Sequence, residues 1–149
     1  MDKDIRSIAG RFDCLLVYFF GSQADQGRRY IEGEDVIPDA FSDLDIAVAF
    51  NKLPAEPIRL YGEIYKELSK LLEPFTIDLV FMHEVNTLFQ YEIIKGVRVY
   101  EKDEFLTDEF EEGIMKQAED LLFKKRIFDS EILEAIEDGY SEFEYSPGS

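Results

Sequence analysis

Short apolar or alternating runs recur along the first two thirds of the chain and predict strands. These runs lie at 15–20, 43–50, 75–82 and 97–100. The first run is continuously apolar and is closed by Gly21-Ser22, which is typical of a buried strand that ends in a turn. The run 43–50 becomes apolar on both faces, so we expect it to be central in a sheet.

Apolar residues at helical spacing separate these runs and predict helices. The expected helices lie at 4–13, 58–72 and 85–94, and from 105 onward. Between them, residues 23–41 are polar and are interrupted by Gly27, Gly33 and Pro38. We therefore expect only a brief helical turn after Ser22, followed by an exposed loop over 30–41.

The order of these elements predicts an α/β (α+β) domain with a small mixed sheet flanked by helices and a C-terminal helical extension. We expect a core over 1–103 and C-terminal helices over 104–139 that pack on the core or on a partner. Asp129-Ser130 is a suitable cap for a separate final helix. Residues 140–149 are predicted to be a disordered tail.

The charge of the chain limits the classes of partner that it can be expected to bind. Its 149 residues carry a formal net charge of −17, which repels nucleic acid and anionic lipid, so direct binding to either is not expected.

The single cysteine, Cys14, lies in an apolar run and is predicted to be a buried small hydrophobe. With no signal peptide and no apolar run long enough to span a bilayer, a cytoplasmic location is expected.

Two short motifs at the ends of neighbouring predicted strands suggest a phosphate and metal site. Gly21 permits a tight turn, and Ser22 with the backbone N–H groups that follow can contact phosphate oxygens. Asp43 and Asp45 lie two residues apart on a strand, so their side chains share one face and repel each other. Mg²⁺ resolves such repulsion because it binds carboxylates together with substrate phosphates. A solvent-exposed strand entrance is the alternative for the aspartate pair alone.

Asp78 is a single carboxylate within the apolar strand 75–82. A buried charge without a partner is costly, so we expect a partner for it. A neighbouring lysine or arginine and a shared metal ion are the two alternatives.

The order of these motifs resembles the nucleotidyltransferase superfamily that includes DNA polymerase beta. A strand is followed by Gly21-Ser22 and a helix, then by Ser42-Asp43-Leu44-Asp45, and later by Ile77-Asp78-Leu79-Val80. The chain most resembles the minimal nucleotidyltransferase branch, from about residue 15 to residue 100. The resemblance implies a nucleotidyltransferase fold and transfer of a nucleotide from ATP with two Mg²⁺ ions. It implies that Asp43, Asp45 and Asp78 hold the metal and that Gly21 and Ser22 grip the β- and γ-phosphates.

The chain departs from the family pattern directly after Ser22. The family usually has Gly-Ser-x-Ala-Arg-Gly, whereas here Asp25 stands in place of the arginine and one extra residue precedes Gly27. Arg28 and Arg29 follow and are candidate substitutes as phosphate contacts, with ordinary surface arginines as the alternative. The loop 30–41 also exceeds the family minimum.

Minimal nucleotidyltransferases are similar to antitoxins whose partner is a HEPN-domain ribonuclease. The resemblance therefore implies transfer of AMP to a tyrosine of a HEPN toxin. Two alternatives stay open, namely an antitoxin that neutralises its partner by binding alone and a small-molecule nucleotidyltransferase of the aminoglycoside type. The sequence also leaves a homo-oligomer open.

Overall fold

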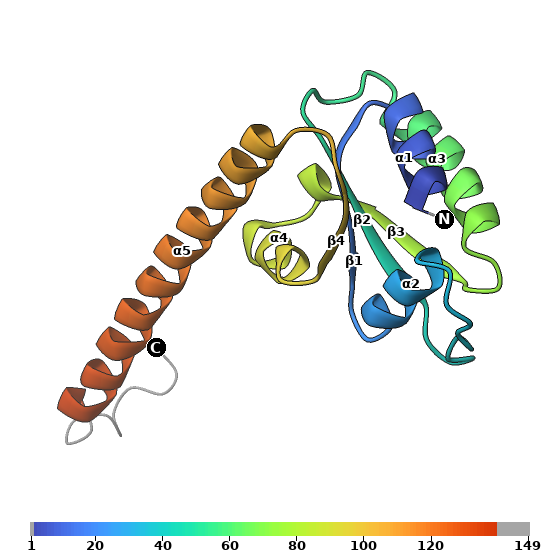
Figure 1. The fold of residues 1–149 in the computed structure, drawn as a ribbon. Coiled ribbons are helices and arrows are strands. Elements are labelled where there is room, and N and C mark those ends of the chain that lie inside the picture. Colours follow the sequence, from blue (N-terminus) through green and yellow to red (C-terminus); the bar gives the residue numbers. More distant parts are fainter. Residues whose placement is uncertain (1, 140–149) are drawn as a thin grey trace. The chain divides into compact units, whose positions relative to one another are not determined.

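The computed structural model describes residues 2–139 as a four-stranded mixed sheet with helices on both faces (Figure 1). The strands are β1 (Cys14–Phe20), β2 (Leu44–Phe50), β3 (Ile77–Phe81) and β4 (Val97–Glu101). Their order across the sheet is β3-β2-β1-β4. Strands β2 and β3 are parallel, whereas β1 is antiparallel to both β2 and β4. The α/β class, the mixed sheet and the central position of β2 are thus confirmed.

The helices fall into two layers. On one face, α1 (Asp2–Arg11), α2 (Ala24–Ile31) and α3 (Pro57–Leu71) bury the apolar side chains of the sheet in one core. On the other face, a short 3₁₀ turn, η1 (Met82–Glu84), leads to α4 (Thr87–Ile94). The first turns of α5 (Glu104–Gly139) add Leu106, Phe110 and Ile114 to this second core. Figure 1 shows α4 on the opposite side of the sheet from α1 and α3.

Helix α2 is longer than the brief turn that the sequence predicts. Gly27, which suggested an interruption, lies inside the helix and is buried against the sheet. A Cβ there would lie 2.8 Å from a methyl carbon of Leu44, so the absent side chain permits close packing. Tyr30 and Ile31 consequently belong to the helix, and the loop starts two residues later than expected.

The prediction of a separate final helix is wrong, because α5 continues from Glu104 to Gly139 without a break. Asp129 pairs with Lys125 at 3.1 Å, one turn earlier, and this contact supports a helix rather than a cap. The predicted tail 140–149 lies outside the described residues.

The chain divides into two compact units, residues 1–114 and residues 115–149. Within the first unit, the start of α5 is held by Glu111, which accepts hydrogen bonds from Tyr18 of β1 and Arg98 of β4. Burial and this carboxylate raise the pKa of Tyr18. In the second unit, α5 exposes large apolar side chains, including Phe123, Phe128 and Leu133.

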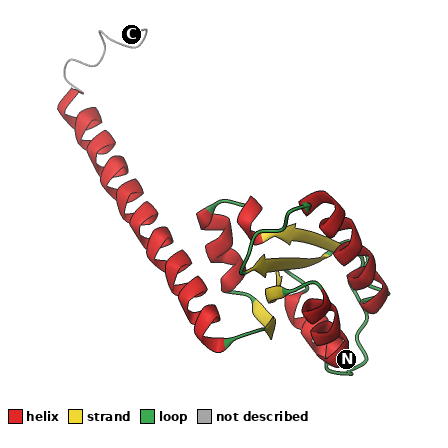
Figure 2. Ribbon diagram, turned by 90° about the horizontal axis from the view of Figure 1, so that it is seen from above, coloured by secondary structure: helices red, strands yellow, loops and turns green. Residues whose placement is uncertain are grey.

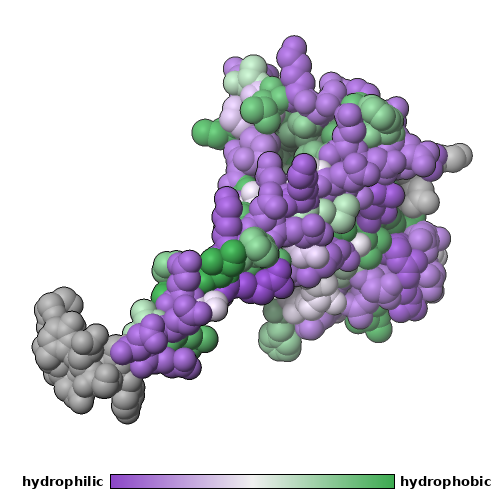
Figure 3. Space-filling model, turned by 90° about the vertical axis from the view of Figure 1, so that its left-hand side faces the viewer, coloured by the Kyte–Doolittle hydropathy of each residue, from purple (hydrophilic) through white to green (hydrophobic). Residues whose placement is uncertain are grey.

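The surface in Figure 3 is mainly hydrophilic, as the net charge of −17 leads one to expect. None of the helices described between residues 2 and 139 has the length and apolar character needed to cross a membrane.

Candidate nucleotide and metal site

The predicted site residues converge at one end of the central strands. Asp45 of β2 and Asp78 of β3 are register partners on parallel neighbouring strands. Asp43 directly precedes β2 and shares the face of Asp45, because side chains two residues apart on a strand point the same way. Gly21 and Ser22 follow β1 at the same end, since Phe20 pairs with Asp45. The structure therefore brings together five residues from three separate segments.

Gly21 lies against the carboxylate of Asp45. Its φ of +77° is in the left-handed region, which favours glycine. A Cβ at Gly21 would lie 2.2 Å from Asp45 Oδ2, far inside van der Waals contact. Only a residue without a side chain can therefore turn here, and its backbone borders the carboxylate directly.

The three carboxylates repel one another. Partial burial, followed by the charges of Asp78 and Asp43, raises the pKa of Asp45 above its ordinary value. None of the ion pairs among the described residues includes Asp43, Asp45 or Asp78. The alternative of a lysine or arginine partner for Asp78 is therefore not supported.

The expectation that Asp78 is buried is wrong. Its side chain is exposed, because β3 is an edge strand and this end of its face is not covered by a helix. An exposed carboxylate needs no partner inside the protein, and it is accessible to a ligand.

Gln23 is a site residue that sequence reasoning missed. Its side chain is only 2% exposed. Gln23 Nε2 donates to the carbonyl oxygen of Ser42 at 2.6 Å, and its Oε1 accepts from the backbone N–H of Asp39 at 2.8 Å. Gln23 thus ties the start of α2 to the segment that leads into Asp43. Its polar character between Ser22 and the apolar Ala24 was the only signal in the sequence.

Asp43 has a hydrogen bond of its own. Thr76 Oγ1, just before β3, donates to Asp43 Oδ1 at 2.9 Å. This contact links the entrances of β2 and β3 and leaves the second carboxylate oxygen, Oδ2, for a ligand.

The two candidate arginines are both paired with carboxylates on the exposed side of α2. Arg28 contacts Asp25 at 2.5 Å and Glu32 at 3.0 Å, and these contacts raise its pKa. Arg29 contacts Glu34 at 3.2 Å. A phosphate would have to compete with these carboxylates, so the part of Arg28 and Arg29 in phosphate binding stays a prediction.

A comparison with protein families matches residues 3–105 to the family described as Polymerase beta, Nucleotidyltransferase. This match covers more than half of the chain. The chain belongs to this nucleotidyltransferase family.

Several solved structures of similar fold are toxin–antitoxin complexes. One, the toxin–antitoxin with AMP-PNP, aligns with a TM-score of 0.62 at 17% identity, over 89% of this chain and 98% of that chain. A mutant of the MntA toxin–antitoxin pair aligns with a TM-score of 0.60 at 16% identity, over 89% of this chain and 98% of that chain. The structure of the tri-AMPylated Shewanella oneidensis HEPN toxin in complex with MNT antitoxin aligns with a TM-score of 0.57 at 15% identity. The alignment covers 89% of this chain and 95% of that chain. At this identity they confirm the fold. A search of curated proteins gives no significant match.

The donor atoms at the acidic end of the sheet, the carboxylate oxygens of Asp43, Asp45 and Asp78, are of the type that binds Mg²⁺. Burial, followed by the charges of Asp78 and Asp43, raises the pKa of Asp45, and a cation relieves the repulsion among these carboxylates. Within residues 2–139, no three acidic, histidine or cysteine side chains are grouped closely enough to form a complete metal site. Mg²⁺ usually keeps several waters and adds substrate phosphates to one or two carboxylates, so a partial ligand set fits it.

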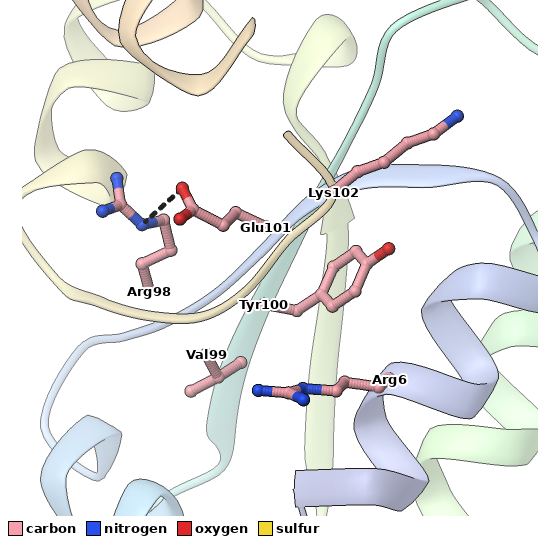
Figure 4. Close-up of a pocket in the computed structure, with 6 residues that line it drawn as sticks. All are labelled: Arg6, Arg98, Val99, Tyr100, Glu101 and Lys102. Atoms are coloured by element: carbon pink, nitrogen blue, oxygen red, sulfur yellow. Dashed lines mark ion pairs between the residues drawn. The ribbon is translucent and has the colours of Figure 1, made fainter. Parts of the chain in front are cut away.

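A surface pocket of about 610 Å³ is drawn in Figure 4, and none of these carboxylates lines it. It is lined by Arg6 and by residues 98–102, the last of which directly follows β4. Glu101 pairs with Leu16, near the start of β1, whereas Gly21 follows the end of β1. Two of its cations are already paired, Arg98 with Glu101 and Glu111 and Lys102 with Asp13. None of the predicted site residues lines this pocket.

Proposed function

We propose that this nucleotidyltransferase moves AMP from ATP, with Mg²⁺, to a tyrosine hydroxyl of a HEPN-type partner. The observation that carries the proposal is the convergence of Gly21, Asp45 and Asp78 at one open end of the sheet. This arrangement offers a turn for phosphates beside carboxylates for a cation, which is the combination that nucleotidyl transfer requires.

Each residue then has a distinct task. Gly21 and Ser22 present backbone N–H groups and a hydroxyl to the β- and γ-phosphates. Asp43 and Asp45 would hold Mg²⁺ through their carboxylate oxygens, and the ion would supply neutralisation of phosphate charge. Asp78, exposed beside Asp45, orients the acceptor hydroxyl and accepts its proton. The acceptor oxygen bonds to the α-phosphorus while the bond to the β-phosphate oxygen breaks, and pyrophosphate leaves.

The class of partner is suggested by the solved structures of similar fold and by charge. One of them holds a tri-AMPylated HEPN toxin in complex with an MNT antitoxin. The net charge of −17 on this chain favours a partner with a basic surface, because complementary charges steer association.

The test is an AMP-transfer assay with purified chain, Mg²⁺·ATP and a HEPN partner, read by the mass of the partner. We expect a mass increase of one AMP or more with wild type and none with Asp43→Asn. Asp35→Asn, an exposed loop carboxylate, is the matched control and should transfer normally. An unmodified partner in an intact complex would contradict the proposal, and transfer to small hydroxylated compounds instead would favour the aminoglycoside-type alternative.

The pairing of Arg28 favours one second candidate, an antitoxin that acts by binding alone. Asp25 stands where the family has arginine, and it occupies Arg28 together with Glu32. An Asp43→Asn/Asp45→Asn double variant separates the two functions. Undiminished neutralisation of the partner by this variant would support binding alone, whereas lost neutralisation with binding retained would support catalysis.

A further inference from the structure

Two phenylalanines lie beside the acidic end of the sheet. Phe20 is the last residue of β1, next in the chain to Gly21, and it is the register partner of Asp45 on β2. Directly opposite residues of an antiparallel pair have their side chains on the same face with Cβ atoms about 4.5–5.5 Å apart. The Phe20 ring is therefore on the same face of the sheet as the Asp45 carboxylate and directly beside it.

Phe89 of α4 extends this aromatic surface. The two rings meet edge to face, with centroids 5.8 Å apart and an interplanar angle of 82°. Phe20 is half-buried, but Phe89 is 41% exposed. This exposure makes part of the Phe89 ring accessible to a ligand.

The backbone that carries Phe89 is held in place from several sides. The backbone N–H of Phe89 donates to Asn86 Oδ1 at 2.9 Å, which caps the start of α4. Gln90 Nε2 donates to the carbonyl oxygen of Met82 at 2.6 Å. At the other end, a Cβ on Gly96 would lie 2.5 Å from the carbonyl oxygen of Phe19, so the chain passes tightly against β1. These contacts fix the backbone at Phe89 before any ligand binds.

We propose that Phe20 and Phe89 form the subsite for the nucleobase of the nucleoside triphosphate. The inference rests on the proposed function, which places the phosphates at Gly21 and the carboxylates. Only the ribose separates the α-phosphate from the base, so a base that leaves this site toward α4 meets the two rings. A neutral aromatic surface stacks any nucleobase and selects weakly among them.

The experiment compares Mg²⁺·ATP with Mg²⁺·tripolyphosphate, which lacks base and sugar, by calorimetric titration of the full chain. Phe89→Ala should weaken ATP binding roughly 5- to 150-fold, the contribution of one stacked base. Tripolyphosphate affinity should not change, and Phe89→Tyr should restore ATP affinity. Leu88→Ala is the matched control, because Leu88 is a neighbouring apolar residue with the similar exposure of 40%.

The outcomes separate this subsite from the function on which it rests. Equal ATP affinities of wild type and Phe89→Ala would overturn the subsite and leave the proposed function standing. Equal losses for ATP and tripolyphosphate would also overturn it, since they would show general damage to the site. Wild-type protein that binds neither ligand would contradict the proposed function and the subsite together.

Discussion

At the residue scale, Gly21 and Asp45 depend on each other. Gly21 has a left-handed φ, and a Cβ added there would lie 2.2 Å from Asp45 Oδ2. The turn at Gly21 and the carboxylate of Asp45, which we propose bind phosphate and metal, therefore cannot be altered independently.

Gly21→Ala should damage both stability and binding. The left-handed φ costs a residue with a Cβ about 1–2 kcal/mol, and the clash displaces the Asp45 carboxylate. Gly33→Ala is the matched control, because Gly33 has a φ of +94° but open space within 4 Å. We expect both variants to lose stability in urea titrations and only Gly21→Ala to lose Mg²⁺·ATP affinity. Equal ATP affinities would show that contact with Asp45 is unimportant.

Asp45→Asn should stabilise the metal-free protein at neutral pH. Because the pKa of Asp45 is raised in the folded state, the native protein binds a proton that the unfolded chain releases above about pH 3.9. The contribution of Asp45 to the free energy of unfolding therefore falls as the pH rises from about 3.9 through the raised pKa of the folded state. Thermal unfolding in EDTA should show the variant to be more stable than wild type at pH 7, with the difference shrinking toward pH 4. An unchanged difference across this range would contradict a raised pKa of Asp45 in the folded protein.

At the element scale, a buried amide joins α2 to the segment before β2. Gln23 bonds to backbone atoms of Ser42 and Asp39, and Ser42 is the neighbour of Asp43. The position of Asp43, a proposed metal ligand, thus depends on Gln23, which lies between Ser22 and the first residue of α2.

Gln23→Leu should keep the volume of the side chain but remove both hydrogen bonds. The unpaired Ser42 carbonyl and Asp39 N–H should cost about 1–3 kcal/mol of unfolding free energy. Looser placement of Asp43 should also lower Mg²⁺·ATP affinity. Gln26→Leu, a half-buried position on the same helix, is the control in parallel denaturation and calorimetric measurements. Full ATP affinity in a destabilised Gln23→Leu variant would leave Gln23 a structural role only.

At the scale of the whole molecule, every candidate site residue lies in the first compact unit, residues 1–114. The family match, residues 3–105, falls in the same unit. The second unit has an exposed apolar surface on α5 and none of the candidate site residues.

A chain that ends at residue 120 should therefore retain cooperative unfolding and full Mg²⁺·ATP affinity. It should associate more weakly with a partner, because it lacks exposed apolar side chains such as Phe123 and Phe128. Calorimetric titration of ATP and sedimentation with a HEPN partner measure the two properties. Lost ATP affinity in a folded truncated chain would show that the second unit takes part in the site.

The sequence by itself determined the local chemistry. Mainly apolar runs specified β1, β2 and β3, and an alternating run specified β4. The run at β1 is continuously apolar because that strand is buried on both faces. The spacing of Asp43 and Asp45 placed both carboxylates on one face, since the side-chain period of a strand is two. Gly21 at the end of an apolar run indicated the turn, although nothing local showed that its neighbour would be Asp45.

Only the tertiary structure decided which distant residues meet and which are exposed. Parallel register sets Asp78 beside Asp45, and the edge position of β3 exposes Asp78, although its own strand is apolar. The same is true of Gln23 and of the paired Arg28, whose partners are chosen by the path of the chain. Periodicity reports the faces of one element, whereas pairing, burial and hydrogen-bond partners depend on the elements packed around it.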